Sequence, residues 1–383
     1  MSTKEQYKDL SVIEKQECIC GWPTDTVNID FNIDDNSEHP YPTLILFTPG
    51  NPGVVQWYIS FLCKVLQQLG NGFAVRACSL AGHGLDDNVV GTDDDHIMQS
   101  FDREHINNKS SEVTKDGQRN FAIPWTMKGQ IIHRTEWIDN ILKDWKIKHP
   151  TSPLPKLVFI NHSIGAHFIQ TMLIQRPDIL KRTQQCILIT PFIRFDPPLL
   201  TKLFLSRTAQ AYRYTIPTIT SIVKVLSAIL PRKLIDIYLN KVMRLNCDNG
   251  RRIALDVFMN DKMVRNHLVL GFEEIRELCE HPNGVALRIL GFETPLSILF
   301  CGKDQWAPES HLRDLQYMQS QSQIPNIQMD YTTKIQHDFI VHPEQIDPVV
   351  EYCVGKIKTS NPSNIKRNSV GEESSSINLR SRL

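Results

Sequence analysis

Short apolar runs recur along the chain and are separated by longer amphipathic stretches. The first run, Thr43–Phe47 (TLILF), is apolar and β-forming and stops at a Pro/Gly cluster, which is typical of a buried parallel strand that meets a loop. Comparable runs, each predicted to be a strand, are Phe73–Leu80, Lys156–Ile160, Cys186–Thr190, Pro295–Gly302 and the more polar Asn326–Thr333.

The stretches between these runs have a helical pattern. Trp57–Gly70 and Gly129–Trp145 carry apolar residues at three- and four-residue spacing, as amphipathic helices do. Strands that alternate with helices favour the α/β class, with a mostly parallel sheet and helices on both of its faces.

Three segments do not fit the alternation. Asp86–Arg119 is long and polar, which predicts a surface excursion. Arg194–Glu293 is rich in helix formers and basic residues and lies between two predicted strands, which indicates an inserted helical cap. The expected division is a polar N-terminal segment at residues 1–39, a core formed by 40–193 and 294–358, the cap at 194–293, and a disordered tail at 359–383.

Composition and charge narrow the class of protein. The chain has 383 residues, of which 41% are hydrophobic and 22% charged, as in a folded globular protein. Its 42 Lys and Arg balance 42 Asp and Glu, so there is no large basic surface for nucleic acid.

The cysteines and the N-terminus bear on the compartment. The nine cysteines are scattered and form no C-x-x-C pair, so we expect reduced, mostly buried thiols in an intracellular protein and no zinc site. The first residues are polar and charged, and no uninterrupted apolar run reaches the roughly 18 residues of a membrane span. We therefore expect neither a signal peptide nor a spanning helix.

A candidate nucleophile lies between a predicted strand and a predicted helix. Asn161–Gly165 (NHSIG) directly follows Lys156–Ile160 and precedes an apolar helical run. A serine in a tight strand-to-helix turn has its hydroxyl exposed at the carboxyl edge of the sheet, and its flanking positions are small because two backbones approach closely. Gly165 meets this requirement, whereas Asn161 stands where a glycine is usual.

If Ser163 is a nucleophile, it needs a histidine base and an acid, in the chain order serine, acid, histidine. Asp304 follows the Pro295–Gly302 run, and His337 follows the last predicted strand. In these positions His337 would take the Ser163 proton during attack, and Asp304 would fix its tautomer. Asp196 is the rival acid.

The reaction also needs donors for an oxyanion. The turn Thr48–Gly53 (TPGNPG) follows the first strand, and its two prolines leave Gly50 and Asn51 as the available backbone donors there. We assign this donor to Asn51 and the companion donor to the N–H of Ile164, directly after the serine.

Several of these motifs together resemble the lipid droplet-associated hydrolase family over roughly residues 40–355. The specific pair is PGNPG (Pro49–Gly53) followed by Tyr58, together with HSIGA (His162–Ala166). Weaker matches are SLAGH at Ser79–His83, GQIIHRTEWI at Gly129–Ile138, the GKDQWAP loop and QHDF at Gln336–Phe339.

The resemblance implies an α/β-hydrolase fold and a triad of Ser163, Asp304 and His337. It also implies a serine lipid hydrolase on lipid droplets and the endoplasmic reticulum, with sterol esters as the usual proposed substrate. The chain departs from the family pattern at Asn161, where a glycine is expected, and in the cap after Phe192, where the sequence FIRFDPPLL differs.

The cap carries the pattern of a membrane-contact segment. Leu199–Met243 combines apolar helical runs with interleaved lysines and arginines, and Lys224 interrupts the longest apolar stretch. Apolar side chains can enter the acyl boundary while cations lie among head groups, so a hairpin in one leaflet is favoured over a span. The alternative is a set of cap helices that pack on their own core.

These observations predict a cap-bearing hydrolase that cleaves carboxylic esters of hydrophobic lipids through an acyl-enzyme on Ser163, without metal or cofactor. A triacylglycerol lipase is one alternative. A catalytically weak droplet or endoplasmic reticulum protein that uses the fold for binding is the other, and Asn161 is the residue that supports it.

Overall fold

A computed structural model of the chain describes residues 7–32, 43–85, 126–195, 212–242, 245, 248–280, 284–324 and 327–360. The predicted excursion at 86–119, the rival acid Asp196 and tail residues 361–383 lie outside these ranges.

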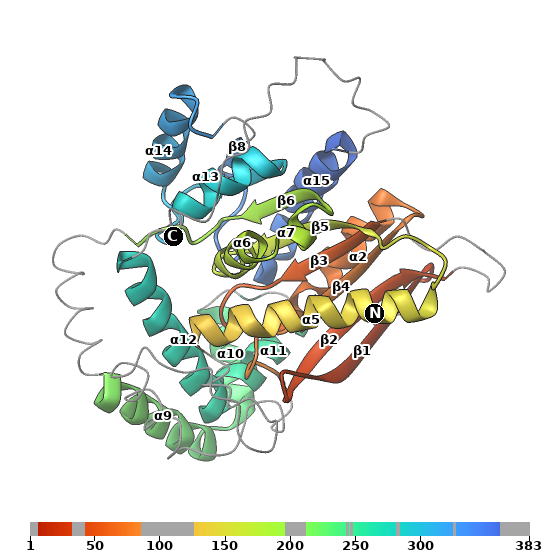
Figure 1. Cartoon of the computed structure of the whole chain (residues 1–383). Helices are drawn as coiled ribbons and strands as arrows, with labels where there is room; N and C mark the ends of the chain where they lie inside the picture. Colours follow the sequence, from red (N-terminus) through yellow and green to blue (C-terminus); the bar gives the residue numbers. More distant parts are fainter. Residues whose placement is uncertain are drawn as a thin grey trace, which may run out of the picture.

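The centre of the molecule is an eight-stranded sheet with the order β1-β2-β4-β3-β5-β6-β7-β8 (Figure 1). From β3 onward the neighbouring strands are parallel, and all six predicted strands are present. Their bounds are β3 Thr43–Thr48, β4 Phe73–Cys78, β5 Lys156–His162, β6 Thr183–Ile189, β7 Leu296–Cys301 and β8 Ile327–Thr332.

Two further strands extend the sheet at its N-terminal edge. β1 (Leu10–Ile19) pairs antiparallel with β2 (Trp22–Phe31), and β2 pairs antiparallel with β4. The predicted boundary at residue 40 was wrong in this respect, because much of the segment 1–39 belongs to the sheet. The middle of β1 is exposed, so the sequence there has the polar character of a solvated edge strand.

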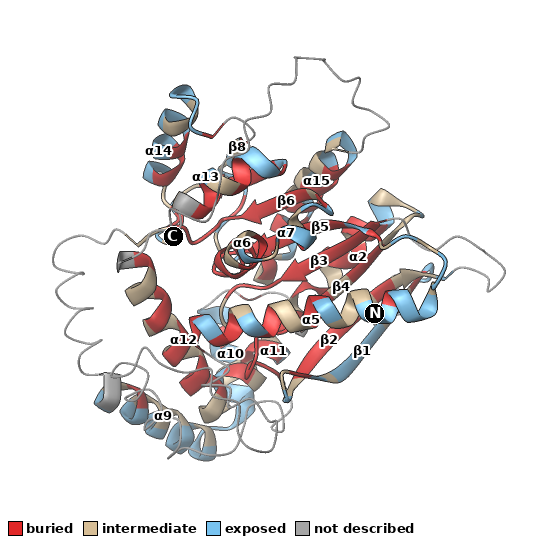
Figure 2. Cartoon of the chain, viewed as in Figure 1, coloured by how far each residue is buried: buried red, intermediate tan, exposed pale blue. Residues whose placement is uncertain are grey.

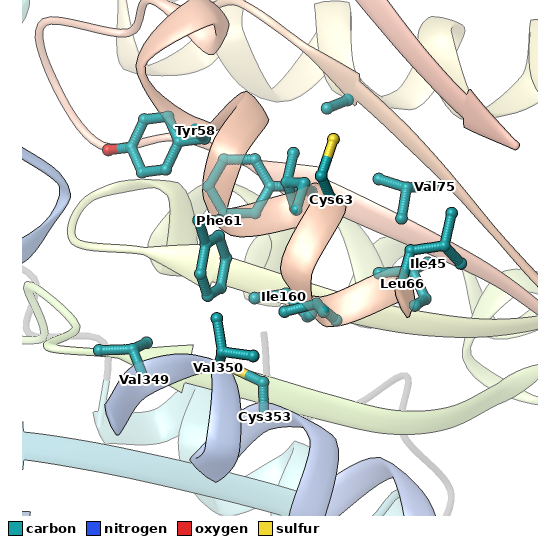
Figure 3. Close-up of a cluster of buried hydrophobic side chains, with 14 of the residues drawn as sticks. Ile45, Tyr58, Phe61, Cys63, Leu66, Val75, Ile160, Val349, Val350 and Cys353 are labelled. Carbon is teal, nitrogen blue, oxygen red and sulfur yellow. The ribbon is translucent and has the colours of Figure 1, made fainter. Parts of the chain in front are cut away.

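The two faces of the sheet are covered by different helices. Ile45 and Phe47 of β3 join one buried cluster with α2 (Ile59–Leu69) and α15 (Pro343–Ser360), which Figure 3 shows in part. Their neighbour Leu46 faces the opposite cluster. The other helices beside that second face are α5 Met127–Lys148, α6 Gly165–Gln175, α7 Pro177–Leu180, α13 Gly284–Glu293 and α14 Glu309–Ser320. Burial on both faces is why these strands are apolar throughout rather than alternating.

The inserted segment forms α9 (Tyr212–Ile229), α10 (Arg232–Lys241), α11 (Asp248–Phe258) and α12 (Asp261–Glu280), here called the cap helices. They lie beyond the carboxyl end of β3. The short helix η1 (Val55–Tyr58) follows that strand, and its Trp57 indole donates to the Gly250 carbonyl of α11 at 3.3 Å.

The last helix of the inserted segment packs differently from the cap helices. Leu287 and Leu290 of α13 are fully buried in the same cluster as the sheet residues, so α13 covers a face of the sheet.

The cap helices differ in burial along their length. α12 is largely buried, whereas α9 is mostly exposed on its outer side (Figure 2). No helix within the described ranges is both long enough and apolar enough to cross a membrane.

The thiols were predicted to be mostly buried, and this burial is confirmed where the structure describes them. Seven described cysteines are free, and five of these are buried: Cys63, Cys78, Cys186, Cys301 and Cys353.

Candidate active site

Ser163 occupies a strained turn between β5 and α6. Its φ is +51°, a left-handed conformation that non-glycine residues rarely adopt and that stores on the order of 1–3 kcal/mol. The turn is also tightly packed: a Cβ on Gly165 would lie 2.6 Å from the Pro49 oxygen and 2.7 Å from the Thr48 oxygen. A Cβ on Gly50 would lie 2.8 Å from the Ser163 Cβ. The predicted tight serine turn is therefore present, packed against the TPGNPG segment.

Asn161 fits this turn without strain of its own. It lies inside β5, paired with Thr48 and Leu188, and its φ is not among the positive values of the described residues. The side chain is fully buried, and its amide nitrogen lies 3.4 Å from the Ile187 carbonyl to which it donates. Asn161 thus leaves the turn at Ser163 intact.

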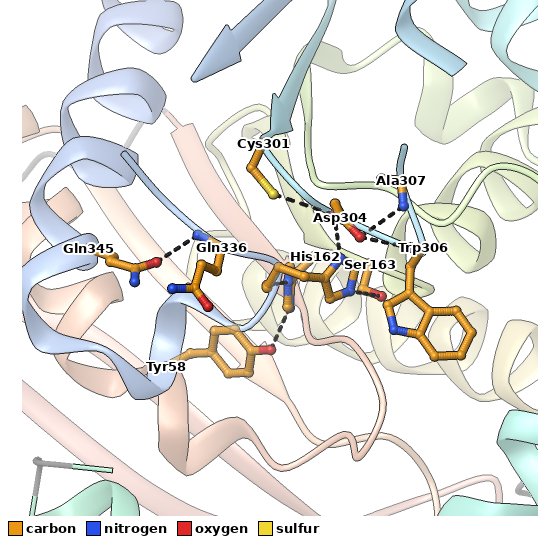
Figure 4. Close-up of polar contacts among 10 residues, drawn as sticks. Tyr58, His162, Ser163, Cys301, Asp304, Trp306, Ala307, Gln336 and Gln345 are labelled. Carbon is orange, nitrogen blue, oxygen red and sulfur yellow. Dashed lines mark hydrogen bonds and ion pairs between the residues drawn. The ribbon is translucent and has the colours of Figure 1, made fainter. Parts of the chain in front are cut away.

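The structure brings together the three side chains that the chain order predicted (Figure 4). The Nε2 of His337 lies 2.9 Å from the Ser163 Oγ, and its Nδ1 lies 2.7 Å from the Asp304 Oδ2. Asp304 lies in the loop after β7, and His337 follows β8. All three residues meet at the carboxyl ends of parallel strands.

The surroundings of Asp304 keep it ionised. Its side chain is fully buried, which by itself would raise its pKa, but hydrogen bonds and charge hold the pKa below the ordinary value. These bonds come from His337 and from the backbone N–H groups of Trp306 (2.8 Å) and Ala307 (3.0 Å).

An ionised carboxylate only accepts hydrogen bonds, so the Nδ1 of His337 carries the proton. In the neutral imidazole the Nε2 is then an acceptor that faces the Ser163 hydroxyl. This is the arrangement that a general base requires.

Two backbone N–H groups beside Ser163 have no acceptor in the described part of the chain. They belong to Asn51 and Ile164, the donors predicted from the sequence. The third candidate, Gly50, packs against His162: a Cβ on Gly50 would lie 3.1 Å from the His162 Nδ1.

The side chain of Asn51 is held by the cap helix α12. Its amide donates to the His267 carbonyl at 3.1 Å and accepts from the His267 Nδ1 at 2.6 Å. Burial raises the pKa of Glu274, about two helical turns further along α12, to about 8, and a hydrogen bond with Asn51 offsets this only in part. The cap therefore contacts the turn that carries the candidate oxyanion donor.

Sequence reasoning assigned no role to four polar residues around the site: Tyr58, His162, His267 and Glu274. Tyr58 and His162 were visible only as parts of the quoted motifs, and His267 and Glu274 only as polar positions of a helical cap. Among the described residues, no group of three or more His, Cys, Asp or Glu side chains is placed to hold a metal ion.

The sheet order and the strained serine turn between β5 and α6 define an α/β-hydrolase fold. One solved structure with this fold is the haloalkane dehalogenase DatA from Agrobacterium tumefaciens C58, 13% identical at a TM-score of 0.51 over 92% of this chain and 98% of that chain. Another is MGS-M2, an α/β-hydrolase enzyme from a Medee basin deep-sea metagenome library, 13% identical at a TM-score of 0.50 over 91% of this chain and 97% of that chain. At such identities only the fold is shared.

Sequence comparison identifies the family. The model of the lipid-droplet associated hydrolases matches residues 41–340, and the chain belongs to this family. It is similar to a lipid droplet-associated hydrolase of Pongo abelii, 30% identical over 171 residues, which are 43% of this chain and 41% of that relative. The match thus spans less than half of the relative's length.

Proposed function

We propose that this protein is a serine hydrolase that cleaves carboxylic esters of hydrophobic lipids. The observation that carries the proposal is the continuous hydrogen-bonded series from Asp304 through His337 to the Ser163 hydroxyl. The two hydrogen bonds in this series are 2.7 Å and 2.9 Å long, within the range of productive general-base geometry.

The reaction would proceed in two halves. In the first, the Ser163 Oγ attacks the ester carbonyl carbon while its proton passes to the Nε2 of His337. The tetrahedral oxyanion accepts hydrogen bonds from the N–H groups of Asn51 and Ile164. Each such donor contributes on the order of 10²–10³ in kcat. His337 then returns the proton to the alcohol oxygen as the C–O bond breaks, which leaves an acyl-enzyme.

In the second half, water replaces the alcohol. His337 takes a proton from this water as the water oxygen attacks the acyl carbon, and the oxyanion again forms between the same two donors. When the intermediate collapses, the proton passes to the Ser163 Oγ and the carboxylic acid leaves.

The surroundings of the serine support a hydrophobic substrate. Ile164 belongs to a buried cluster with Phe168, Phe192 and Leu270, against which Trp306 packs. Phe195 stacks on Trp306 with ring centroids 5.8 Å apart. Apolar and aromatic side chains beside the serine favour an acyl chain or a ring system over a polar ester. We take sterol esters as the preferred substrate and triacylglycerol as the alternative.

The exposed faces of α9 and α10 support attachment to a lipid surface. The apolar residues there that are at least 45% exposed are Tyr214, Ile222, Val225, Leu226 and Ile229 of α9 and Leu234, Ile237 and Tyr238 of α10. Lys224, Arg232 and Lys233 lie among them in the sequence. This combination suits the monolayer of a lipid droplet or the surface of the endoplasmic reticulum, where apolar groups enter the acyl region and cations meet head groups.

A binding role without appreciable hydrolysis is the competing function, and one observation favours it. Ser163 is only 8% exposed, so a substrate has little access to its hydroxyl in this structure. Under this alternative the apolar face of α9 and α10 would still attach the protein to droplets.

A substrate comparison tests the proposal. The purified protein and its Ser163→Ala variant are incubated with emulsified cholesteryl oleate, with triolein and with a soluble p-nitrophenyl ester. We expect release of fatty acid from at least one lipid by the wild type alone. Equal rates for wild type and Ser163→Ala on all three esters would contradict the proposal and favour the binding role.

A further inference from the structure

A second histidine lies beside the candidate triad and has a hydrogen-bonding partner on each ring nitrogen. His162 directly precedes Ser163 and is 5% exposed. Its Nδ1 lies 2.7 Å from the Tyr58 hydroxyl, and its Nε2 lies 2.8 Å from the backbone carbonyl oxygen of His337 (Figure 4).

Tyr58, His162 and the His337 carbonyl form a second hydrogen-bonded series, and the chemistry of its members fixes the position of each proton in it. A carbonyl only accepts, so the Nε2 of His162 carries a hydrogen and donates it to His337. Burial lowers the pKa of His162 to about 3, so the ring is neutral and its Nδ1 is an acceptor. The Tyr58 hydroxyl must therefore donate to Nδ1.

The series joins the two loops that the reaction needs. At one end, Gly50, next to the candidate oxyanion donor Asn51, packs against His162, since a Cβ on Gly50 would lie 3.1 Å from the His162 Nδ1. At the other end is the carbonyl of His337, the candidate base. The middle is rigidly packed, because the Tyr58 ring lies 4.6 Å from Phe47 and the His162 ring lies 5.3 Å from Phe339, between ring centroids.

The loop that carries His337 is anchored on either side by the buried side chains of Ile335 and Phe339. Its neighbours Gln336 and Asp338 are exposed. Their backbone groups bond elsewhere: the Gln336 N–H donates to the Gln345 side chain at 2.7 Å, the Gln336 carbonyl accepts from the Phe339 N–H at 3.1 Å, and the Asp338 carbonyl accepts from the Val341 N–H at 3.0 Å. His162 supplies the bond to the backbone of His337 itself.

We propose that Tyr58 and His162 are positioning residues, which hold the His337 backbone and the Gly50–Asn51 turn at a fixed distance from Ser163. This inference rests on the proposed hydrolase function. Neither side chain takes a proton from the substrate. Their effect is on geometry, and a displacement of about 1 Å in a reacting group can cost on the order of 10²-fold in rate.

The test uses Tyr58→Phe, which removes one hydroxyl and keeps the ring. Tyr7→Phe is the matched control, because Tyr7 is buried in the same apolar cluster and its hydroxyl bonds to Ser60 at 3.0 Å, outside the series. Steady-state hydrolysis of a p-nitrophenyl ester and the rate of labelling by a fluorophosphonate probe are measured for both variants and the wild type.

We expect Tyr58→Phe to lower kcat and the labelling rate by about 10- to 100-fold, with KM changed less than about threefold. Tyr7→Phe should match the wild type. His162→Gln, whose side-chain amide can still donate to the His337 carbonyl, should retain more activity than His162→Leu. If the loss of activity came only from weakened folding, the activity of each variant would follow its Tm. His162→Gln would then have no advantage over His162→Leu at equal Tm.

The outcomes distinguish this inference from the proposed function. Wild-type labelling with an unchanged rate for Tyr58→Phe would overturn the inference and leave the hydrolase proposal intact. So would equal losses in His162→Gln and His162→Leu. No labelling of the folded wild type would overturn the hydrolase proposal and this inference with it.

Discussion

Replacing Asp304 with asparagine tests the electrostatic part of the site with a minimal change in shape. In the wild type, one carboxylate oxygen accepts from the N–H groups of Trp306 and Ala307, and the other accepts from the Nδ1 of His337. The two backbone donors require an acceptor, so the asparagine oxygen must take their side. Its NH₂ group then faces His337.

This orientation of the asparagine reverses the tautomer of His337. An NH₂ group donates, so the Nδ1 of His337 must become the acceptor and the proton moves to Nε2, the nitrogen that faces the Ser163 hydroxyl. The base is then protonated at the position where it should receive a proton. We expect Asp304→Asn to lower kcat by on the order of 10⁴-fold, or about 5.5 kcal/mol in the activation free energy.

The assay is ester hydrolysis, paired with circular dichroism and thermal unfolding. The two backbone hydrogen bonds survive in Asp304→Asn, so the fold should be retained and the loss should lie in kcat. Asp304→Ala, which removes the acceptor of both bonds, should in addition lower the Tm. If folded Asp304→Asn kept more than about a tenth of the wild-type kcat, the reasoning from the tautomer would be refuted.

Three further predictions concern the lipid-facing surface, the serine turn and the cap. Leu226→Ser with Ile229→Ser on α9, where these side chains are 46% and 70% exposed, should weaken binding to droplet-like emulsions by about 2 kcal/mol, or about thirtyfold in flotation assays. Gly165→Ala should lower the unfolding free energy by about 1–3 kcal/mol in denaturant titrations, because the added Cβ would meet two backbone oxygens. The wild type should lose stability as pH rises towards 8, and Glu274→Gln should not show this loss. The unfolded chain releases this proton near its ordinary pKa of 4.5 whereas the folded chain keeps it to about 8, which amounts to about 1.4 kcal/mol per pH unit in that window.

The first two of these predictions have a control in the same chain. Ile147→Ser changes an apolar residue that is 68% exposed on α5, outside the cap helices, and should not affect emulsion binding. Gly355→Ala adds a Cβ in α15 with nothing within 4 Å and should not destabilise the protein. Unchanged flotation of the α9 variant, wild-type stability of Gly165→Ala, or parallel stability curves for Glu274→Gln would contradict the respective argument.

The sequence was sufficient for the parallel part of the sheet because those strands are buried on both faces and are therefore continuously apolar. β1 and β2 were missed for the opposite physical reason. β1 is the edge strand, and its exposed middle carries Glu14, Lys15 and Gln16. β2 lies between β1 and β4, and its buried positions include the polar residues Thr24, Asp25 and Thr26. Such a strand is stabilised by pairing with its neighbour, and this pairing leaves little trace in the local pattern of hydrophobic residues.

The candidate site shows the same division. Chain order and positions at strand ends were enough to select Ser163, Asp304 and His337, because parallel strands bring their carboxyl ends to one edge. The contact between Tyr58 and His162 joins positions 104 residues apart, and the bond from His267 to Asn51 joins positions 216 apart. Hydrogen bonds over such separations depend on how the loops and the cap close over the sheet, which local sequence patterns do not specify.

The measurement that tests the central claim most directly is labelling of the purified, folded protein by a fluorophosphonate probe, which reacts with activated serines. We expect a single labelled site on the wild type and loss of the label in both Ser163→Ala and His337→Ala, with unchanged circular dichroism. Absence of label on folded wild type, or label that persists in Ser163→Ala, would contradict it.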